Sequence, residues 1–131
     1  SFPVAFTDGA IEAVDALAEE HTLAIVTYGD PDVQEKKMEK AGLDKALFST
    51  IVVCREPNKG PHYKTIFEKY GEDPLDVVVC GDRIERDLLP AKELGFNTVL
   101  MRWGRGKTQE FDSTVIDREI NSLRELLQIN N

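Results

Sequence analysis

Two aspartates follow the most apolar short run of the chain. In VVVCGDRIERDLLPAKELG, residues 77–95, the run ends at Gly81, Asp82 comes next, and Asp87 lies where a helix is predicted to begin. Carboxylates are hard oxygen ligands, and Mg²⁺ in proteins usually takes one or two of them together with water and phosphate oxygens. The pair therefore indicates a metal site, although each aspartate also has a structural interpretation, Asp82 as a turn residue and Asp87 as a helix N-cap.

Two further positions have the chemistry to bind a phosphate. Thr27 ends the apolar run TLAIVT and is followed by Tyr28, Gly29 and a predicted helix, and a hydroxyl beside the N–H groups of a helix N-terminus binds anions. Lys59 lies in the loop EPNKGP, before another predicted helix, where its charge would neutralise a phosphate. Taken singly, Thr27 is an ordinary strand residue and Lys59 a solvated loop lysine, so the prediction depends on the fold bringing these groups together.

Apolar runs that indicate strands alternate with segments that indicate helices. We expect strands at 22–27, 49–54, 76–80 and 97–101 with an edge strand at 113–116, and helices at 9–20, 30–41, 62–70 and 87–94 with a last one capped by Asp117. This alternation is typical of βαβ units, and continuous apolar strands favour a parallel sheet covered on both faces, a three-layer α/β/α fold. Ligands bind at the carboxyl edge of such sheets, where Thr27, Lys59 and Asp82 all fall.

Composition limits the classes of protein. The 131 residues are enough for one domain, 1–131, and the net charge of −8 argues against a general nucleic-acid or membrane-surface binder. No apolar run approaches the ~18 residues of a membrane span, and no signal-peptide pattern is present. The two cysteines, Cys54 and Cys80, do not make a disulfide framework. We interpret them as reduced core thiols and expect a cytoplasmic protein.

The sequence resembles the haloacid-dehalogenase-like (HAD) hydrolases over nearly its whole length. LAIVTYGD is similar to their second motif, NKGPHYKTIFEKYG to the third, and VVVCGDRIERDLLPAKELGFNTVLMRWGRG to the fourth, which is the most specific. The resemblance implies that Thr27 binds the transferring phosphoryl group with the help of Tyr28 and Gly29. It also implies that Lys59 offsets the phosphoryl charge, with Lys64 the weaker candidate for that role, and that Asp82 and Asp87 hold Mg²⁺.

Basic residues near these motifs are candidates for contact with an anionic substrate. They are Arg83 and the loop Arg102–Lys107, and the alternative is a basic surface turn packed over Trp103. The resemblance implies a Mg²⁺-dependent phosphatase for a small phosphorylated metabolite, although dehalogenase and phosphonatase chemistry occur on the same core. A receiver domain is disfavoured because the early acidic pair is missing, and a Rossmann nucleotide binder because TYGDPD is not a Gly-rich turn.

The family's first motif, a strand ending in Asp-x-Asp, is not found before Thr27. The first aspartate of that motif is the nucleophile and the second the general acid/base. The nearest match is PVAFTDG, but Phe6 stands at the nucleophile position and Asp8 is better explained as a helix N-cap. Three explanations remain open: a piece of a longer enzyme, a degenerate domain that binds a phosphorylated ligand or a protein partner, or an acid supplied by Asp8 or a second chain.

The missing motif has a structural consequence. By resemblance its strand lies in the sheet centre, between LAIVT and DVVVC, so the chain alone is expected to be inactive and to have an interrupted sheet. The sheet would close up, recruit residues 3–7 or borrow a strand from a neighbour. Open edges of apolar strands promote pairing between chains, so we predict a homo-oligomer.

Overall fold

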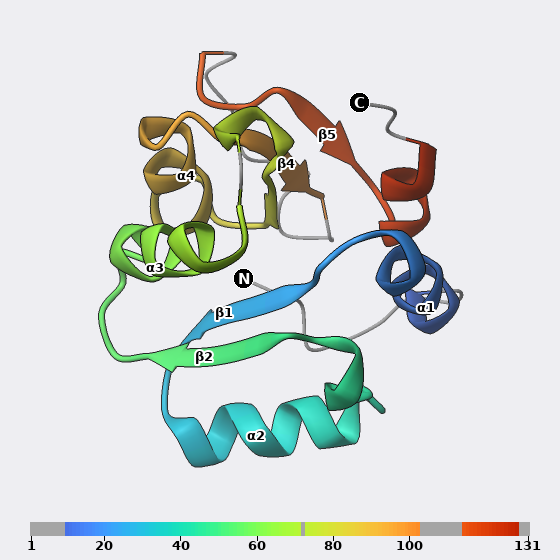
Figure 1. Cartoon of the computed structure of the whole chain (residues 1–131). Helices are drawn as coiled ribbons and strands as arrows, with labels where there is room; N and C mark the ends of the chain where they lie inside the picture. The colour runs from blue at the N-terminus through green and yellow to red at the C-terminus, as the bar shows by residue number, and fades with distance from the viewer. Residues whose placement is uncertain (1–9, 72, 103–113, 129–131) are drawn as a thin grey trace.

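The structure, a computed structural model, describes residues 10–71, 73–102 and 114–128 (Figure 1). Strands and helices alternate through most of it. The strands are β1 (Ala24–Tyr28), β2 (Thr50–Cys54), β3 (Val78–Gly81), β4 (Asn97–Met101) and β5 (Arg118–Ile120), and the α-helices are α1 (Ala10–Glu20), α2 (Pro31–Lys40), α3 (Gly60–Tyr70) and α4 (Leu89–Glu93). Shorter helical turns are the 3₁₀ segments Lys45–Leu47, Pro74–Asp76 and Leu123–Gln128 and the π-helical segment Ile84–Leu88.

Across the residues that the structure describes, all strand pairs are parallel and the strands form two separate sheets. One sheet pairs β1 with β2, from Ala24 opposite Thr50 to Tyr28 opposite Cys54, and the other has the order β3-β4-β5. Within the described residues no ladder joins β1 to β3. The fold class predicted from the sequence, α/β with parallel strands, is confirmed, and the break falls where the resemblance places the strand of the first motif. The suggestion that residues 3–7 occupy this place lies outside the described residues.

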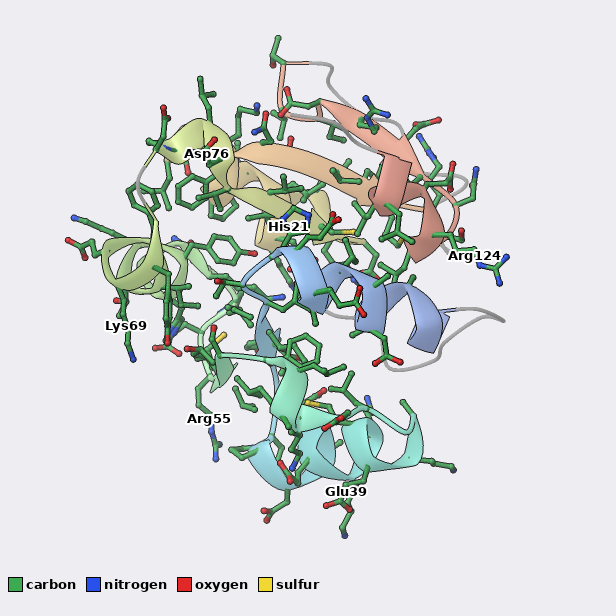
Figure 2. The ribbon with its side chains drawn as sticks, turned by 45° about the vertical axis from the view of Figure 1, so that its right-hand side comes forward. His21, Glu39, Arg55, Lys69, Asp76 and Arg124 are labelled. Atoms are coloured by element: carbon green, nitrogen blue, oxygen red, sulfur yellow. The ribbon has the colours of Figure 1, made fainter. Side chains whose placement is uncertain are left out.

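The core nevertheless crosses the break between the sheets. One cluster of buried side chains joins Ala13 and Val14 of α1 and Ile25 of β1 to Val99 and Met101 of β4. Charged side chains such as Glu39, Lys69 and Arg124 point away from the body of the molecule (Figure 2). Burial of apolar area is the main favourable contribution to folding, so side-chain packing rather than a continuous ladder holds the two sheets together.

Helix α2, which follows β1, has few apolar residues on its inner face, and its ends are fixed by capping residues. The Asp30 carboxylate accepts hydrogen bonds from the N–H groups of Asp32 and Val33, at 2.9 and 3.1 Å, and Pro31 takes the first turn, where its missing N–H is not needed. Gly42 follows the helix with φ 77°, a conformation that residues with a Cβ rarely adopt.

Two boundaries near the C-terminus were predicted wrongly. The edge strand is Arg118–Ile120, and the described part of the predicted one, residues 114–116, contains a turn instead of a strand, because Asp117 and Thr98 tie the entry of β5 to β4. The Asp117 carboxylate does not cap a helix: it accepts from the N–H of Thr98 at 2.8 Å and from the Lys92 ammonium at 2.5 Å. Ile120, which would lie in a helix capped by Asp117, instead ends β5, and the last helical segment is a 3₁₀ helix, Leu123–Gln128.

Both cysteines are free thiols, in line with the sequence interpretation. Burial raises the pKa of Cys54, and it raises the pKa of Cys80 to about 12, so both remain protonated at neutral pH. In the part of the chain that the structure describes, no helix is long and apolar enough to span a membrane.

Candidate active site

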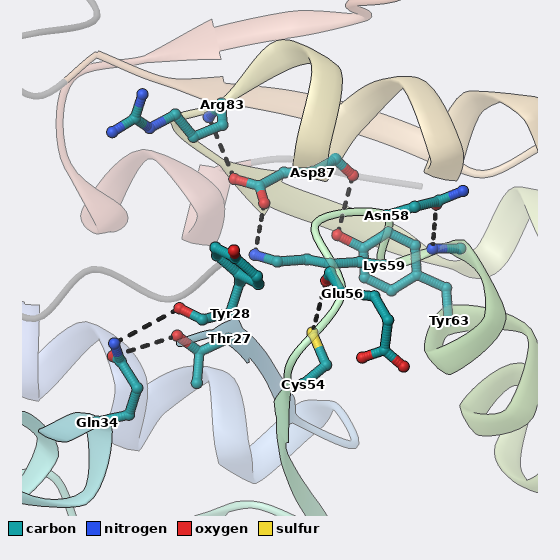
Figure 3. Close-up of polar contacts among 11 residues, drawn as sticks. Thr27, Tyr28, Gln34, Cys54, Glu56, Asn58, Lys59, Tyr63, Arg83 and Asp87 are labelled. Atoms are coloured by element: carbon teal, nitrogen blue, oxygen red, sulfur yellow. Dashed lines mark hydrogen bonds and ion pairs between the residues drawn. The ribbon is translucent and has the colours of Figure 1, made fainter. Parts of the chain in front are cut away.

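A fully buried ion pair joins two of the predicted site residues (Figure 3). The Lys59 ammonium lies 2.5 Å from Oδ1 of Asp87, and these residues are 1% and 0% exposed. Lys59 immediately precedes α3, and Asp87 lies in the π-helical segment that follows β3. The alternative interpretation of Lys59 as a solvated loop lysine is therefore wrong. Moving two charges out of water is costly, and each is tolerated here because the other compensates it.

The turn after β3 is folded tightly around Asp87. The second oxygen of the Asp87 carboxylate accepts from the backbone N–H of Arg83 at 3.1 Å, and the N–H of Asp87 donates to the Arg83 carbonyl at 2.9 Å. A Cβ on Gly81 would lie 2.6 Å from the Cβ and Oδ2 of Asp87, so the glycine of the Gly-Asp pair makes room for the second aspartate.

The helix after β3 begins earlier than predicted, and Asp87 is not its N-cap. Helical turns start at Ile84, and the N–H of Leu89 donates five residues back to the Ile84 carbonyl. Pro90 comes next, and it has no N–H to give to the Arg86 carbonyl in a regular α-helix. The Asp87 carboxylate consequently points back toward Gly81 and Arg83 instead of forward to the next turn.

Electrostatics keep the Asp87 carboxylate charged. Burial alone would raise its pKa, whereas the charge and hydrogen bond of the adjacent Lys59 ammonium act to lower it, and the net shift of the Asp87 pKa is downward. Tyr63, one turn into α3, donates its hydroxyl to the Asp87 carbonyl at 2.9 Å. Asp87 is thus held at its carboxylate by Lys59 and Arg83 and at its main chain by Tyr63.

Thr27, the predicted phosphate-binding residue at the end of β1, lies at the same carboxyl edge of the sheets. Thr27 is buried, its hydroxyl lies 3.4 Å from Oε1 of Gln34 in α2, and the Gln34 amide nitrogen lies 3.5 Å from the Tyr28 carbonyl. The Tyr28 ring lies across the break from the π-helical segment, with the Arg86 guanidinium 5.2 Å from its centroid. This cation–π contact links the carboxyl end of β1 to the turn that carries Asp87.

Gly29 completes the end of β1. Its φ of 148° is one that side-chain-bearing residues rarely adopt, and a Cβ there would meet the Gln34 amide nitrogen at 2.5 Å. Its N–H donates to the Cys54 carbonyl of β2 at 3.0 Å. The glycine therefore lets the chain turn sharply from β1 into α2, with Thr27 left at the strand end.

The remaining predicted residues lie around this centre. Asp82 is partly buried directly after β3, Arg83 has an exposed side chain, and Lys64 is exposed on α3. The loop 103–107 lies outside the described residues. The roles of Thr27, Tyr28, Gly29, Lys59, Arg83, Asp82 and Asp87 in binding stay predictions.

Two carboxylates suit Mg²⁺ chemically. Asp82 and Asp87 supply the hard oxygen atoms that this ion prefers. One Asp87 oxygen faces the Lys59 ammonium and the other accepts from the Arg83 N–H. No group of three or more His, Cys, Asp or Glu side chains forms a metal site within the described ranges.

Three residues near the site were missed by sequence reasoning: Gln34, Tyr63 and Arg86. The sequence gives no reason to single out Gln34 or Arg86, because polar residues are common in helices. Tyr63 did carry one, because residues four apart on a helix share a face, and Tyr63 lies four residues after Lys59.

Comparison with known proteins identifies the family. The model of the HAD-hydrolase-like family matches residues 53–126, which include Lys59, Asp82 and Asp87. The chain belongs to the HAD-like hydrolases. This HAD-like chain is 35% identical over 113 residues to the glyceraldehyde 3-phosphate phosphatase of Methanocaldococcus jannaschii, covering 82% of the chain and 48% of that protein. The enzyme of the same name from Methanopyrus kandleri is 33% identical over 115 residues, again covering 82% of the chain and 48% of the relative.

Solved structures agree with the fold. The magnesium-bound HAD hydrolase YfnB of Bacillus subtilis superposes with a TM-score of 0.76 at 23% identity, covering 93% of this HAD-like chain and 54% of YfnB. A HAD phosphatase from Thermococcus onnurineus gives a TM-score of 0.72 at 25% identity, with 93% and 56% covered. The chain thus spans about half the length of the curated relatives and structures that it matches.

Proposed function

We propose that this HAD-like chain forms the phosphate- and Mg²⁺-binding part of a phosphatase for a small phosphorylated metabolite. The observation that carries the proposal is the buried Lys59–Asp87 pair at the carboxyl edge of the sheets, on the same edge as Thr27. The similar proteins of M. jannaschii and M. kandleri are named glyceraldehyde 3-phosphate phosphatases, which makes that metabolite the first substrate to test.

Each residue has a distinct part in the proposed binding site. The Thr27 hydroxyl, with the Tyr28–Gly29 turn that follows it, contacts the phosphoryl oxygens, and Lys59 offsets their charge. Asp82 holds Mg²⁺ directly, and Asp87 contributes to the same ion while it orients Lys59. The ion, when bound, neutralises charge on the phosphoryl group. Arg83, exposed beside Asp82, contacts the anionic substrate.

The described residues supply binding groups but no nucleophile beside Thr27. Covalent phosphoryl transfer in this family requires an aspartate at the end of a central strand, as the resemblance implies. The break between β1 and β3 is where a strand ending in Asp-x-Asp would complete the sheet. We therefore propose that the 131-residue chain alone is inactive and that catalysis requires such a strand.

The test adds the strand and asks for activity. An apolar strand ending in Asp-x-Asp is joined before residue 1 through a flexible linker, and hydrolysis of glyceraldehyde 3-phosphate is measured with Mg²⁺. We expect turnover only in the extended chain, lost when the first added aspartate becomes asparagine and lost with Lys59→Met. Equal turnover by the unextended chain would contradict the proposal.

The extended chain also distinguishes a phosphatase from the alternative, a domain that binds a phosphorylated ligand without catalysis. Phosphorus NMR reports whether inorganic phosphate binds the extended chain in the presence of Mg²⁺. Phosphate binding that depends on Lys59 and Asp82, with no turnover in any extended form, would favour a degenerate domain that binds a phosphorylated ligand.

A further inference from the structure

Helix α3 holds Asp87 at two points. The Lys59 ammonium, directly before the helix, contacts the Asp87 carboxylate at 2.5 Å, and the Tyr63 hydroxyl, one turn later, donates to the Asp87 carbonyl at 2.9 Å (Figure 3). The side chain and the main chain of one residue are thus bound by the same turn of another element. Rotation of the π-helical segment would break both contacts together.

The position of the Tyr63 hydroxyl is set by packing. Tyr63 is 7% exposed and belongs to a buried cluster with Val26 of β1, Cys54 of β2, Ala91 of α4 and Phe96. These neighbours come from both sides of the break between the sheets. The ring is therefore a rigid spacer, in contrast to the flexible four-carbon stem of Lys59.

The tyrosine is also a dependable donor. Burial, and then the Asp87 charge, raise the pKa of Tyr63 well above its usual range, so the hydroxyl keeps its proton throughout the neutral range. On the accepting side, the segment Ile84–Leu88 departs from the regular helical ladder, since the Leu89 N–H donates five residues back to the Ile84 carbonyl. A side-chain donor from outside the segment fixes its main chain at that point.

We infer that Tyr63 is a positioning residue: its hydroxyl holds the segment Ile84–Leu88 so that the Asp87 carboxylate meets the Lys59 ammonium. The catalytic value of this arrangement rests on the proposed function, whereas the contact itself does not. Loss of the hydroxyl should leave the packed ring in place, free the Asp87 main chain and loosen the ion pair.

The test uses the 131-residue chain and Tyr63→Phe, which removes one oxygen and keeps the ring. The ammonium protons of Lys59 are followed by ¹H–¹⁵N NMR, since a buried ion pair slows their exchange with water. We expect exchange to become about tenfold faster in Tyr63→Phe, the size expected for the loss of one net hydrogen bond. The matched control is Tyr70→Phe, an exposed tyrosine of the same helix, which should change the rate less than about twofold.

A second control separates positioning from general loss of stability. Thr98→Val removes a buried hydroxyl that donates to the Val115 carbonyl, on the far side of β4, and should leave the Lys59 signal unchanged. Unaltered Lys59 exchange in Tyr63→Phe, or an equal acceleration in Thr98→Val, would overturn the inference.

A measurement on the unchanged chain decides the matter if Tyr63→Phe does not fold. The exchange of tyrosine hydroxyl protons can be read from isotope shifts on the ring carbons. We expect Tyr63 to exchange at least about tenfold more slowly than the exposed Tyr28 and Tyr70. Equal rates would overturn the inference. None of these measurements involves phosphate hydrolysis, so failure of the phosphatase proposal and failure of the positioning role are distinguishable.

Discussion

At the scale of single residues, the buried ion pair of Lys59 and Asp87 is the feature of the site with the largest expected effect on stability. Both are removed from water, and their attraction offsets a desolvation cost of several kcal/mol per ion. Replacing one partner leaves the other buried and uncompensated. Lys59→Met should therefore lower the free energy of unfolding by about 3–5 kcal/mol, as measured by urea denaturation.

The double variant Lys59→Met, Asp87→Leu is the matched control for this prediction. It removes both charges and fills a similar volume with apolar atoms, so we expect it to be more stable than the single variant Lys59→Met. Double and single variants of equal stability would show that the pair is not a closed buried unit.

Acid should weaken the fold through the same aspartate. Burial acts to raise the pKa of Asp87 and the Lys59 ammonium acts to lower it, and in the folded chain this pKa lies below the value of about 3.9 of an unfolded aspartate. The stabilisation is therefore present above about pH 4 and is lost as the pH falls through the folded pKa, because the unfolded chain then binds the proton more readily. The free energy of unfolding should fall more steeply below pH 4 in the unchanged chain than in the double variant. Parallel curves would contradict this assignment.

The residue types at the site could be predicted because they follow strands whose carboxyl ends share an edge. Thr27, Lys59, Asp82 and Asp87 were found in this way. The direct contact of Lys59 with Asp87 could not be predicted, because it depends on how the loop before α3 folds over the turn after β3. Lys59 was placed in a loop by sequence, and only the tertiary structure buries it.

At the scale of elements, the tight approach of β3 to the π-helical segment is the feature most open to test. A Cβ on Gly81 would lie 2.6 Å from the Asp87 side chain, so Gly81→Ala must displace Asp87 or the strand end. We expect a loss of about 1–3 kcal/mol in the free energy of unfolding, typical of overpacking. The loss should be accompanied by faster exchange of the Lys59 ammonium protons.

Gly60→Ala provides the control for this prediction. The nearest atom to a Cβ at Gly60 is Oδ1 of Asn58, at 3.0 Å, an exposed side-chain atom that accepts from the Gly60 N–H at 2.9 Å and would have to shift by only a few tenths of an ångström. Its effect should stay within about 1 kcal/mol, since alanine also favours the helix that begins there. If both alanine variants lose the same stability, the close packing of Gly81 on Asp87 is not the cause.

The apolar strands were predictable as elements, whereas their ends and the special turns were not. Runs such as TLAIVT and DVVVC are too apolar for a surface segment, and four of the five strands were located from such runs. The strand β5 has the sequence REI, in which the two charged residues are exposed. Its position is set by pairing with β4. The π geometry of Ile84–Leu88 could not be predicted, because the proline that follows it, Pro90, is equally typical of the first turn of an α-helix.

At the scale of the whole molecule, the two sheets are joined by side chains rather than by a ladder. Buried residues of α1, β1 and β4 form one cluster. Tyr63 belongs to a second cluster, whose members also come from both sides of the break between the sheets. The proposed site is therefore divided, with Thr27 on one sheet and Asp82 and Asp87 beside the other, and α3 bridges them. The resemblance predicted this break because it placed the strand of the first motif there.

The break also predicts how the chain behaves in solution. Within the described residues, β1 and β3 each have a partner on one side alone, and Val78 of β3 is an exposed apolar residue. Unpaired backbone groups on apolar strands promote association of chains. We expect sedimentation velocity at micromolar concentration to show a dimer or a larger oligomer.

A charge on the strand edge should abolish this association. Val78→Lys places an ammonium group on β3, where a second strand would have to bury it, and should give a monomer. Val33→Lys changes an equally exposed apolar residue on α2, away from the strand edges, and should leave the oligomer intact. A monomeric unchanged chain would show that the edges are satisfied within one molecule, and an oligomer that persists in Val78→Lys would place the contact elsewhere. The chain extended by a first strand should sediment as a monomer, because that strand would pair with β1 and β3 at once.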